Sequence, residues 1–175
     1  MTINFNQQKY KNLLALMESG NDYKKVNSIG ALGKYQFMPN TLNSLKTIYG
    51  LEDWRSANYF LNNPEIQELY ETTLIADTLG FIERNNLKFY LNKKVNGTKR
   101  FKNISAPLNI YGMLAASHLA GTNALKDFLI NGTNPNDGFT SLSDYAAYFS
   151  SKLQDSLNLF PLILAFIPAI VLYYK

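Results

Sequence analysis

Apolar residues recur at helical spacing along most of the chain, and the segments between them are rich in glycine, asparagine and proline. This periodicity predicts six helices, with an ordered loop at 20–35 between the first two. Only the segment 93–102 predicts β structure, because Asn96-Gly97 is flanked there by residues able to pair as strands. The pattern therefore predicts a mainly α fold with one small β-hairpin, and the helices are expected at 9–19, 39–50, 63–84, 107–120, 123–131 and 141–155.

The C-terminal end departs from this pattern. Between Leu157 and Tyr174 the only polar side chain ahead of the tyrosine pair is Asn158. As a helix these 18 residues would span roughly 27 Å, close to the ~30 Å hydrocarbon core of a bilayer. We therefore expect residues 1–155 to form the folded domain and 156–175 to form a membrane-associated, transmembrane-like helix. A buried helix folded back on the domain is the alternative.

The composition limits the classes of function. The chain has 175 residues, of which 46% are hydrophobic, so it can bury a core and is not typical of disordered proteins. It has no cysteine and one histidine, which excludes disulfides and a cysteine nucleophile and gives no basis for expecting a metal or other cofactor. The net charge of +4 does not by itself indicate nucleic acid as a partner. Five of the 17 basic residues lie in 93–102, which indicates a solvated hairpin or a surface attracted to an anionic cell wall or to phospholipid headgroups.

A candidate acid–base site lies at the end of the first predicted helix. Glu18 ends an apolar helix and precedes a glycine-bearing loop, so its carboxyl is expected at the edge of a cleft with apolar walls. Such surroundings favour the neutral form, which a general acid requires. Gly30 and Gly33 let the backbone approach a ligand closely, and Gln36 offers a donor and an acceptor suited to the amide and hydroxyl groups of a sugar.

These residues belong to a longer pattern. Glu18-Ser19-Gly20 is followed by Gly-Ala-Leu-Gly-Lys-Tyr-Gln-Phe-Met-Pro at 30–39, and Gln36 lies 18 positions after Glu18. The pattern resembles the lytic transglycosylases of the goose-type-lysozyme-like superfamily, which cleave the glycan of bacterial peptidoglycan. Lysine and tyrosine here replace the leucine and methionine of the family's Gly-Leu-Met-Gln. Three further segments are similar to motifs of phage-encoded members: 94–97, 113–121 and 140–145.

The resemblance implies a lysozyme-like domain and a mechanism with one carboxylate. Glu18 would protonate the glycosidic oxygen between N-acetylmuramic acid and N-acetylglucosamine, and would then accept the proton of the C6 hydroxyl as a 1,6-anhydro ring closes. Most glycosidases use two carboxylates instead. Tyr145 would orient Glu18 or the N-acetyl group. The substrate contacts are expected from Ser28, Tyr35, Gln36, His118 and Tyr145.

Several of these residues have simpler alternative roles. Gln36 could cap its own loop, and Ser28 could hydrogen-bond only within that loop. His118 and Tyr145 could both belong to the core. Asp22 is the nearest second carboxylate, and it is more typical of a loop turn than of a base that activates water.

Together these features predict a peptidoglycan lytic transglycosylase whose partners are glycan strands and, through its tail, a lipid membrane. The first nine residues contain no apolar run typical of a secretory signal. With the phage-like motifs, this predicts a virion-associated enzyme at a phage or host envelope, with other virion proteins as further partners. Two alternatives stay open: a muramidase that uses water, and a membrane-anchored structural virion protein with a degenerate glycan site.

Overall fold

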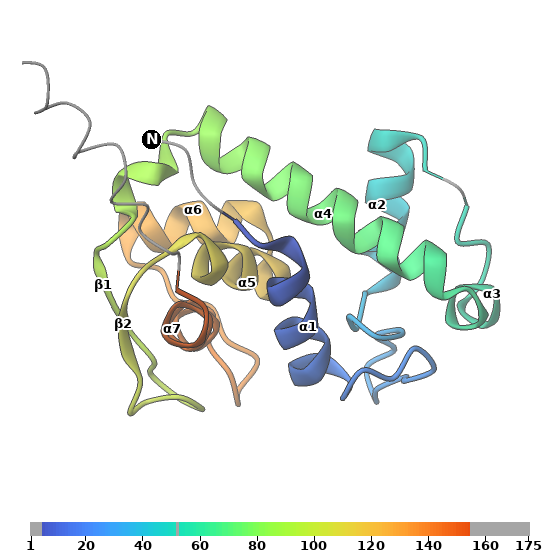
Figure 1. The fold of residues 1–175 in the computed structure, drawn as a ribbon, viewed down its shortest axis with the longest axis horizontal. Helices are drawn as coiled ribbons and strands as arrows, with labels where there is room; N and C mark the ends of the chain where they lie inside the picture. The colour runs from blue at the N-terminus through green and yellow to red at the C-terminus, as the bar shows by residue number, and fades with distance from the viewer. Residues whose placement is uncertain (1–4, 52, 155–175) are drawn as a thin grey trace, which may run out of the picture.

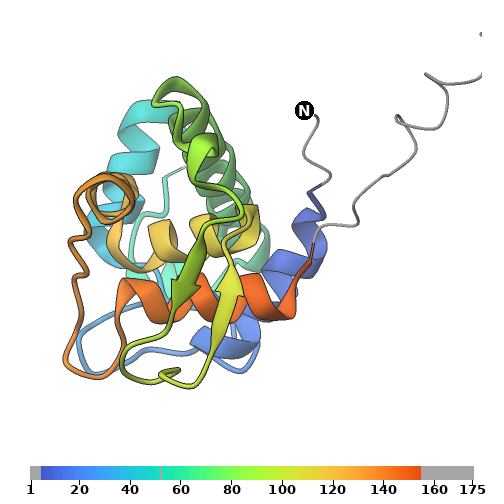
Figure 2. The ribbon, with the colours of Figure 1, turned by 90° about the vertical axis from the view of Figure 1, so that its left-hand side faces the viewer.

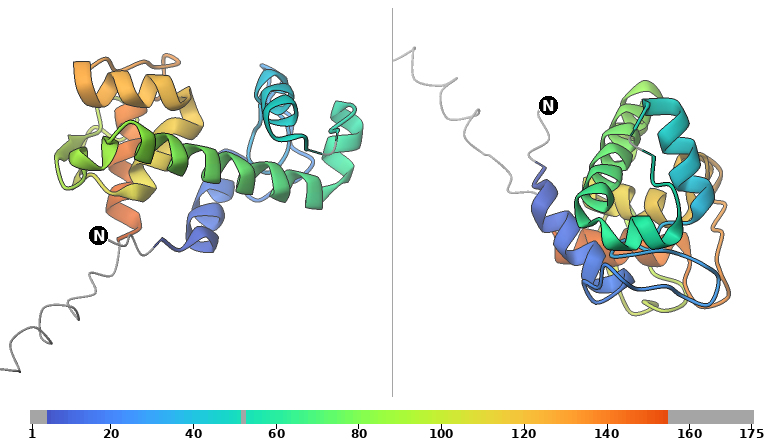
Figure 3. Two further views of the ribbon diagram at one scale, coloured as in Figure 1. Left: turned by 90° about the horizontal axis from the view of Figure 1, so that it is seen from above. Right: turned by 90° about the vertical axis from the view of Figure 1, so that its right-hand side faces the viewer.

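The longest helix, α4 (Pro64–Arg84), runs along most of the molecule (Figure 1). The structure is a computed structural model that describes residues 5–51 and 53–154. Seen from above, α2 and α3 lie beside the N-terminal half of α4, and α5, α6, α7 and the hairpin lie toward its other end (Figure 3). The remaining elements are α1 (Gln7–Glu18), α2 (Pro39–Tyr49), α3 (Ala57–Asn62), the 3-10 helix η1 (Leu87–Tyr90), β1 (Lys94–Asn96), β2 (Ser105–Pro107), α5 (Ile110–Ala120), α6 (Thr122–Asn131) and α7 (Leu142–Lys152).

Helix α5 forms the centre of the core. Every residue from Ile110 to Ser117 is buried, and the helix packs against α4, α6 and α7. Gly112 permits the close approach of α7, because a Cβ atom at this position would lie 2.5 Å from the carbonyl oxygen of Ala146. Toward α4, the hydroxyls of Thr78 and Ser117 are hydrogen bonded at 3.2 Å. The central helix is thereby fixed against both neighbours.

Helix α1 is held against the C-terminal half of the domain. Asn6 caps its start, and the amide of Asn6 donates to the hydroxyl of Tyr111 at 3.0 Å. The buried ring of Tyr10 packs on Phe149 of α7, with ring centroids 5.8 Å apart. These contacts fix the position of α1, and with it Glu18 at the last turn, relative to α5 and α7.

The small hairpin is confirmed, but its turn differs from the predicted one. The strands pair antiparallel between Lys94 and Pro107, so residues 97–104 form the connection in place of a tight turn at Asn96-Gly97. The backbone amides of this loop are satisfied by the buried carboxylate of Asp144, a long-range partner that no local pattern reveals. The hairpin crosses in front of α7, which contacts both strands (Figure 2).

The six predicted helices are confirmed, with ends that differ from the predicted ones by a few residues. The pattern does not predict α3 or η1, because elements of six and four residues are too short to show a helical period. The expected apolar helix at 156–175 lies outside the described residues. Among the residues that the structure does describe, no helix has the length and apolar content needed to cross a bilayer.

Candidate active site

A cleft with a volume of about 1000 Å³ opens between the end of α1, the helices α2 and α4, and the junction of α5 with α6. Its walls combine apolar side chains with many polar and charged ones, so the cleft can contact both the C–H faces and the hydrogen-bonding groups of a ligand. Four of the residues predicted from the sequence line this cleft: Glu18, Gln36, His118 and Tyr145.

Glu18 and Tyr145 are directly hydrogen bonded. The hydroxyl of Tyr145 donates to Oε1 of Glu18 at 2.6 Å. Within the described part of the chain, the other carboxyl oxygen, Oε2, has no hydrogen-bond partner. Burial, followed by the charge of Glu18 and this hydrogen bond, raises the pKa of Tyr145 far above its usual range, so the phenol stays a donor at neutral pH. One carboxyl oxygen is therefore fixed, and the other can meet a ligand.

The first turn of α7 fixes the position of Tyr145. Ser141 and Asp144 form a capping box, in which each side chain accepts a hydrogen bond from the other's backbone amide. The ring of Tyr145 is 5% exposed and stacks on Phe149, with centroids 5.8 Å apart. A phenylalanine at position 145 would keep this packing and lose only the hydrogen bond to Glu18.

Ser19 connects Glu18 to the loop that follows it. The Ser19 hydroxyl donates to the carbonyl oxygen of Lys34 at 2.8 Å and accepts from the amide of Asp22 at 2.9 Å. Asp22 is exposed, accepts from the amide of Lys24 at 2.7 Å, and is not among the residues that line the cleft. This is the loop turn expected from the sequence, and it does not bring Asp22 to the cleft.

The same loop is anchored to α4 by the buried side chain of Gln67. Its Oε1 accepts from the amide of Lys34 at 2.8 Å, and its Nε2 donates to the carbonyl oxygen of Tyr23 at 3.0 Å. Gly33 has a φ of +73°, and a Cβ atom there would lie 2.1 Å from Oε1 of Gln67. Glycine is therefore favoured at position 33 by its conformation, and a larger residue there would displace the Gln67 side chain.

Gln36 and its neighbour Tyr35 lie on opposite sides of the loop. Gln36 lines the cleft, and its Nε2 also donates to the carbonyl oxygen of Gly33 at 2.8 Å, so it caps its own loop as well. Tyr35 is fully buried and does not line the cleft, so the structure does not bring it together with Gln36, His118 and Glu18 as the sequence predicts. Ser28 is exposed and also lies outside the cleft lining.

Tyr35 belongs instead to a cluster around Glu68 of α4. The hydroxyl of Tyr35 donates to Oε1 of Glu68 at 2.8 Å. Burial alone would raise the pKa of Glu68, but hydrogen bonds from its neighbours outweigh burial and lower the pKa to about 2. This charged cluster holds α1, the loop and α4 together behind the cleft. Four side chains donate to it: Lys11, Lys34, Tyr23 and Tyr35.

His118 in the cleft wall and Glu71 behind it form a pair with buried side chains. Nε2 of His118 lies 3.0 Å from the carbonyl oxygen of Tyr35, and since a carbonyl can only accept, Nε2 carries a proton. Nδ1 lies 3.6 Å from Oε2 of Glu71, and the two side chains are 8% and 1% exposed. Among the described residues, neither Nδ1 nor either Glu71 oxygen has a hydrogen-bond partner.

Burial raises the pKa of Glu71 to about 7, although the charge of His118 opposes this shift. The pair thus connects α4 through α5 to the backbone of Tyr35, next to Gln36 in the cleft wall.

Glu71 and Asp137 are not predicted as site residues from the sequence, and Arg100 is predicted only as one of the basic residues of the segment 93–102. Arg100 and Asp137 line the cleft from two loops. After burial and Glu18, their charges also act on Tyr145, and Arg100 lowers its pKa whereas Asp137 raises it. The helical period places Glu71 on the same face of α4 as Gln67 and Ile75, but it does not reveal that a glutamate on this face is buried.

Among the described residues, no group of three or more histidine, cysteine, aspartate and glutamate side chains could hold a metal ion. Comparison of the chain with protein-family models, curated proteins and solved structures finds no match.

Proposed function

We propose that the protein is a peptidoglycan lytic transglycosylase in which Glu18 acts as both acid and base. The observation that carries this proposal is the half-buried carboxyl of Glu18, held by Tyr145 through one oxygen in a cleft that Gln36 and His118 also line. The order and spacing of the sequence motifs support the same reaction.

In the proposed reaction, protonated Glu18 donates its proton to the glycosidic oxygen between N-acetylmuramic acid and N-acetylglucosamine. As the C1–O bond breaks, the muramyl N-acetyl oxygen stabilises the positive charge at C1. The Glu18 carboxylate then accepts the proton of the C6 hydroxyl while O6 bonds to C1. One bond to C1 breaks and one forms, Glu18 regains its proton, and no water is consumed.

The hydrogen bond from Tyr145 assists this cycle. The phenol donor fixes the rotation of the Glu18 carboxyl group, so its second oxygen keeps one direction in the cleft. Because the bond occupies Oε1, the proton transfers are assigned to Oε2. Tyr145 acts through Glu18 and is therefore a positioning residue.

A muramidase is the second candidate, because Asp137 lines the same cleft. Its Oδ1 accepts hydrogen bonds from the amides of Phe139 at 2.8 Å and Thr140 at 2.7 Å. The hydrogen bond from Thr140 is the main cause that lowers its pKa. An ionised carboxylate can activate water, so a muramidase would need Asp137, whereas the transglycosylase reaction would proceed in Asp137→Asn.

The cellular setting is proposed from the sequence. The uncharged stretch 157–174 supports attachment to a membrane, and the similarity of 113–121 to phage-encoded members supports a virion-associated enzyme that acts on the host wall. A structural virion protein with a degenerate site would share this location and would lack turnover.

The test uses the full-length protein in detergent with purified peptidoglycan, and measures the release of soluble glycan fragments. Glu18→Gln should lower the rate at least about 100-fold, the contribution expected of acid–base catalysis. Glu65→Gln, which neutralises an exposed acid on α4 away from the cleft, is the matched control and should leave the rate unchanged. Full activity of Glu18→Gln would refute the proposal.

A further inference from the structure

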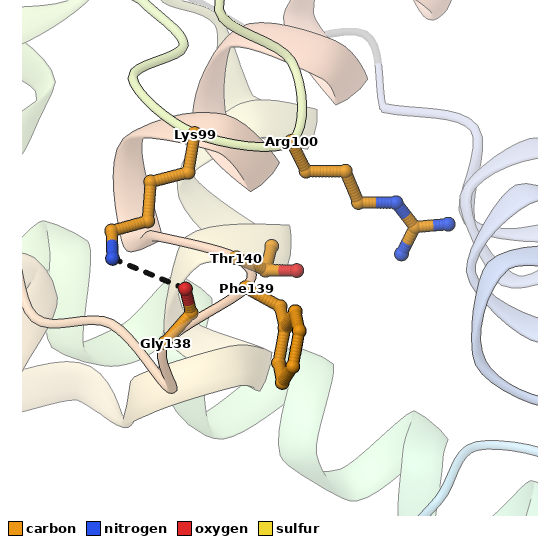
Figure 4. Close-up of a pocket in the computed structure, with 5 residues that line it drawn as sticks. All are labelled: Lys99, Arg100, Gly138, Phe139 and Thr140. Atoms are coloured by element: carbon orange, nitrogen blue, oxygen red, sulfur yellow. Dashed lines mark hydrogen bonds between the residues drawn. The ribbon is translucent and has the colours of Figure 1, made fainter.

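A second cavity, of about 540 Å³, is shallow and open to solvent. Arg100 and Thr140 line both this cavity and the cleft, so the two are neighbours. In Figure 4, Lys99 and Arg100 descend from the hairpin loop, and Phe139 lies on the opposite loop. The five residues that line the cavity are Lys99, Arg100, Gly138, Phe139 and Thr140.

The backbone of the hairpin loop is held in place by hydrogen bonds to Asp144. The fully buried carboxylate of Asp144 accepts hydrogen bonds from the amides of Lys99 at 3.1 Å and Arg100 at 3.2 Å. It also accepts from the amides of Thr98 at 2.9 Å and Phe101 at 3.1 Å. Burial alone would raise the pKa of Asp144, but these and its other hydrogen bonds lower it to about 2. The carboxylate therefore stays ionised, and the backbone that carries the two cations is fixed.

The opposite loop is fixed in the same way. Oδ1 of Asp137 accepts hydrogen bonds from the amides of Phe139 and Thr140. Nζ of Lys99 donates to the carbonyl oxygen of Gly138 at 3.2 Å, and this bond connects the two loops. The carboxylates of Asp137 and Asp144 are thus both bonded to backbone amides. Among residues 5–51 and 53–154, no carboxylate lies within ion-pair distance of Lys99 or Arg100.

Phe139 adds an apolar surface beside these charges. Its side chain is 85% exposed, the most exposed of the large hydrophobic residues in the described part of the chain. A pyranose ring presents a face of C–H groups that packs on an aromatic ring. The guanidinium group of Arg100 together with the exposed ring of Phe139 therefore matches a sugar that carries an anionic group.

We propose that this cavity is a carboxylate-binding extension of the glycan cleft, an inference that rests on the proposed function. Arg100 binds a carboxylate of a muramyl residue, since its planar fork matches that group, and Phe139 packs on the adjoining sugar ring. The carboxylate has two possible sources, the free lactyl group of the sugar or the stem peptide attached to it.

Binding is measured by isothermal titration with full-length Glu18→Gln protein, which keeps the cleft and removes the proposed acid. Three ligands separate the sources of the anion: glycan strands freed of peptide by an amidase, the same strands with their lactyl carboxylates converted to neutral methylamides, and strands that retain the peptide. Arg100→Met is compared with Lys102→Met, which removes one charge from the same loop but lies outside both cavities.

Arg100→Met should weaken binding of a carboxylate-bearing strand about fivefold, as for an exposed ion pair, and leave the methylamide strand unaffected. If Arg100→Met loses affinity only for the peptide-free strand, Arg100 binds the lactyl carboxylate. If it loses affinity only for the peptide-bearing strand, Arg100 binds a carboxylate of the peptide. Phe139→Ser should weaken all three ligands alike, and Lys102→Met should change none of them.

Two results would overturn the assignment. If Arg100→Met binds all three strands as the parent does, or loses affinity for all three equally, the cavity does not recognise a carboxylate, while the proposed function stands. If the parent Glu18→Gln protein binds none of the strands, the subsite and the proposed function fail together.

Discussion

The hydroxyl of Tyr145 lies 2.6 Å from Oε1 of Glu18, although 127 positions separate the two residues in the chain. This bond joins the end of α1 to the first turn of α7 inside the cleft. The bond leaves Oε2 of Glu18 as the carboxyl oxygen that is free to meet a ligand.

Replacing Tyr145 with phenylalanine should lower kcat roughly 10–100-fold with little change in KM, since a hydrogen bond to a charged group is lost while the ring still packs on Phe149. Steady-state release of glycan fragments gives both constants, and circular dichroism checks the fold. Tyr148→Phe, on the same helix but outside the cleft lining, is the control. An unchanged kcat in Tyr145→Phe would exclude the positioning role.

Two glycines of the loop between α1 and α2 allow a matched comparison of two variants. Gly30 and Gly33 both have positive φ, at +85° and +73°, but only Gly33 has a neighbour within 4 Å of its missing Cβ, namely Gln67. Gly30→Ala should therefore cost only about 1–2 kcal/mol of conformational strain. Gly33→Ala should cost more and should also lower activity, because Gln67 must leave the amide of Lys34.

Urea denaturation of both variants, with activity measured in parallel, tests this difference. Equal losses of stability in Gly30→Ala and Gly33→Ala would mean that Gln67 does not hold the loop.

The buried Glu71 predicts a dependence of stability on pH. Its pKa of about 7 in the folded protein lies above the ordinary value of 4.5, so the folded state binds this proton more tightly than the unfolded state does. This contribution to stability is complete below about pH 4.5 and is lost as the pH rises through 7. Glu71→Gln, which stays neutral, should gain in Tm relative to the wild type as the pH is raised from 4.5 to 8.

Glu68 on the same helix should behave in the opposite sense. Its pKa is lowered to about 2, so its contribution to stability is present above pH 4.5 and is lost as the pH falls toward 2. At neutral pH, Glu68→Gln should cost about 1–3 kcal/mol because the buried Lys11 loses its carboxylate and keeps only hydrogen bonds to the Glu68 carbonyl oxygen and Thr72. Thermal unfolding of both variants across this pH range tests the signs, and parallel curves would contradict them.

The hydrophobic tail gives a prediction about membranes. Deleting residues 156–175 should abolish flotation of the protein with phosphatidylcholine vesicles, since the uncharged stretch would be removed. A variant that keeps the tail but carries Lys93→Gln and Lys94→Gln tests the hairpin as the alternative anchor. If the truncated protein floats as well as the full-length protein, the tail is not the anchor.

The spacing of apolar residues and the signals at helix ends are sufficient to predict the long helices, even α5, which is buried on every side from Ile110 to Ser117. The pairing of Glu18 with Gln36 in one cleft was predictable from their shared motif. The orientation of Tyr35 was not, because Gln36 has a φ of +52° in an irregular loop and no periodic rule relates the two side chains. The hairpin turn was mispredicted because its amides bond to Asp144, more than 40 positions away.

The positions of Glu71 and Arg100 at the site are not predictable from the sequence, for different reasons. A glutamate in an amphipathic helix is usually solvated, so its burial beside His118 shows only once α4 and α5 are packed. Arg100 belongs to the cleft only because Asp144 anchors its loop there. Both depend on tertiary contacts that a single sequence does not display.

The most direct test of the central claim is mass spectrometry of the fragments that the full-length protein releases from peptidoglycan, with Glu18→Gln in parallel. The account predicts muropeptides that lack one water and end in 1,6-anhydromuramic acid, formed by the wild type and absent with Glu18→Gln. Fragments with reducing muramic ends would contradict the single-carboxylate transglycosylase and indicate a muramidase.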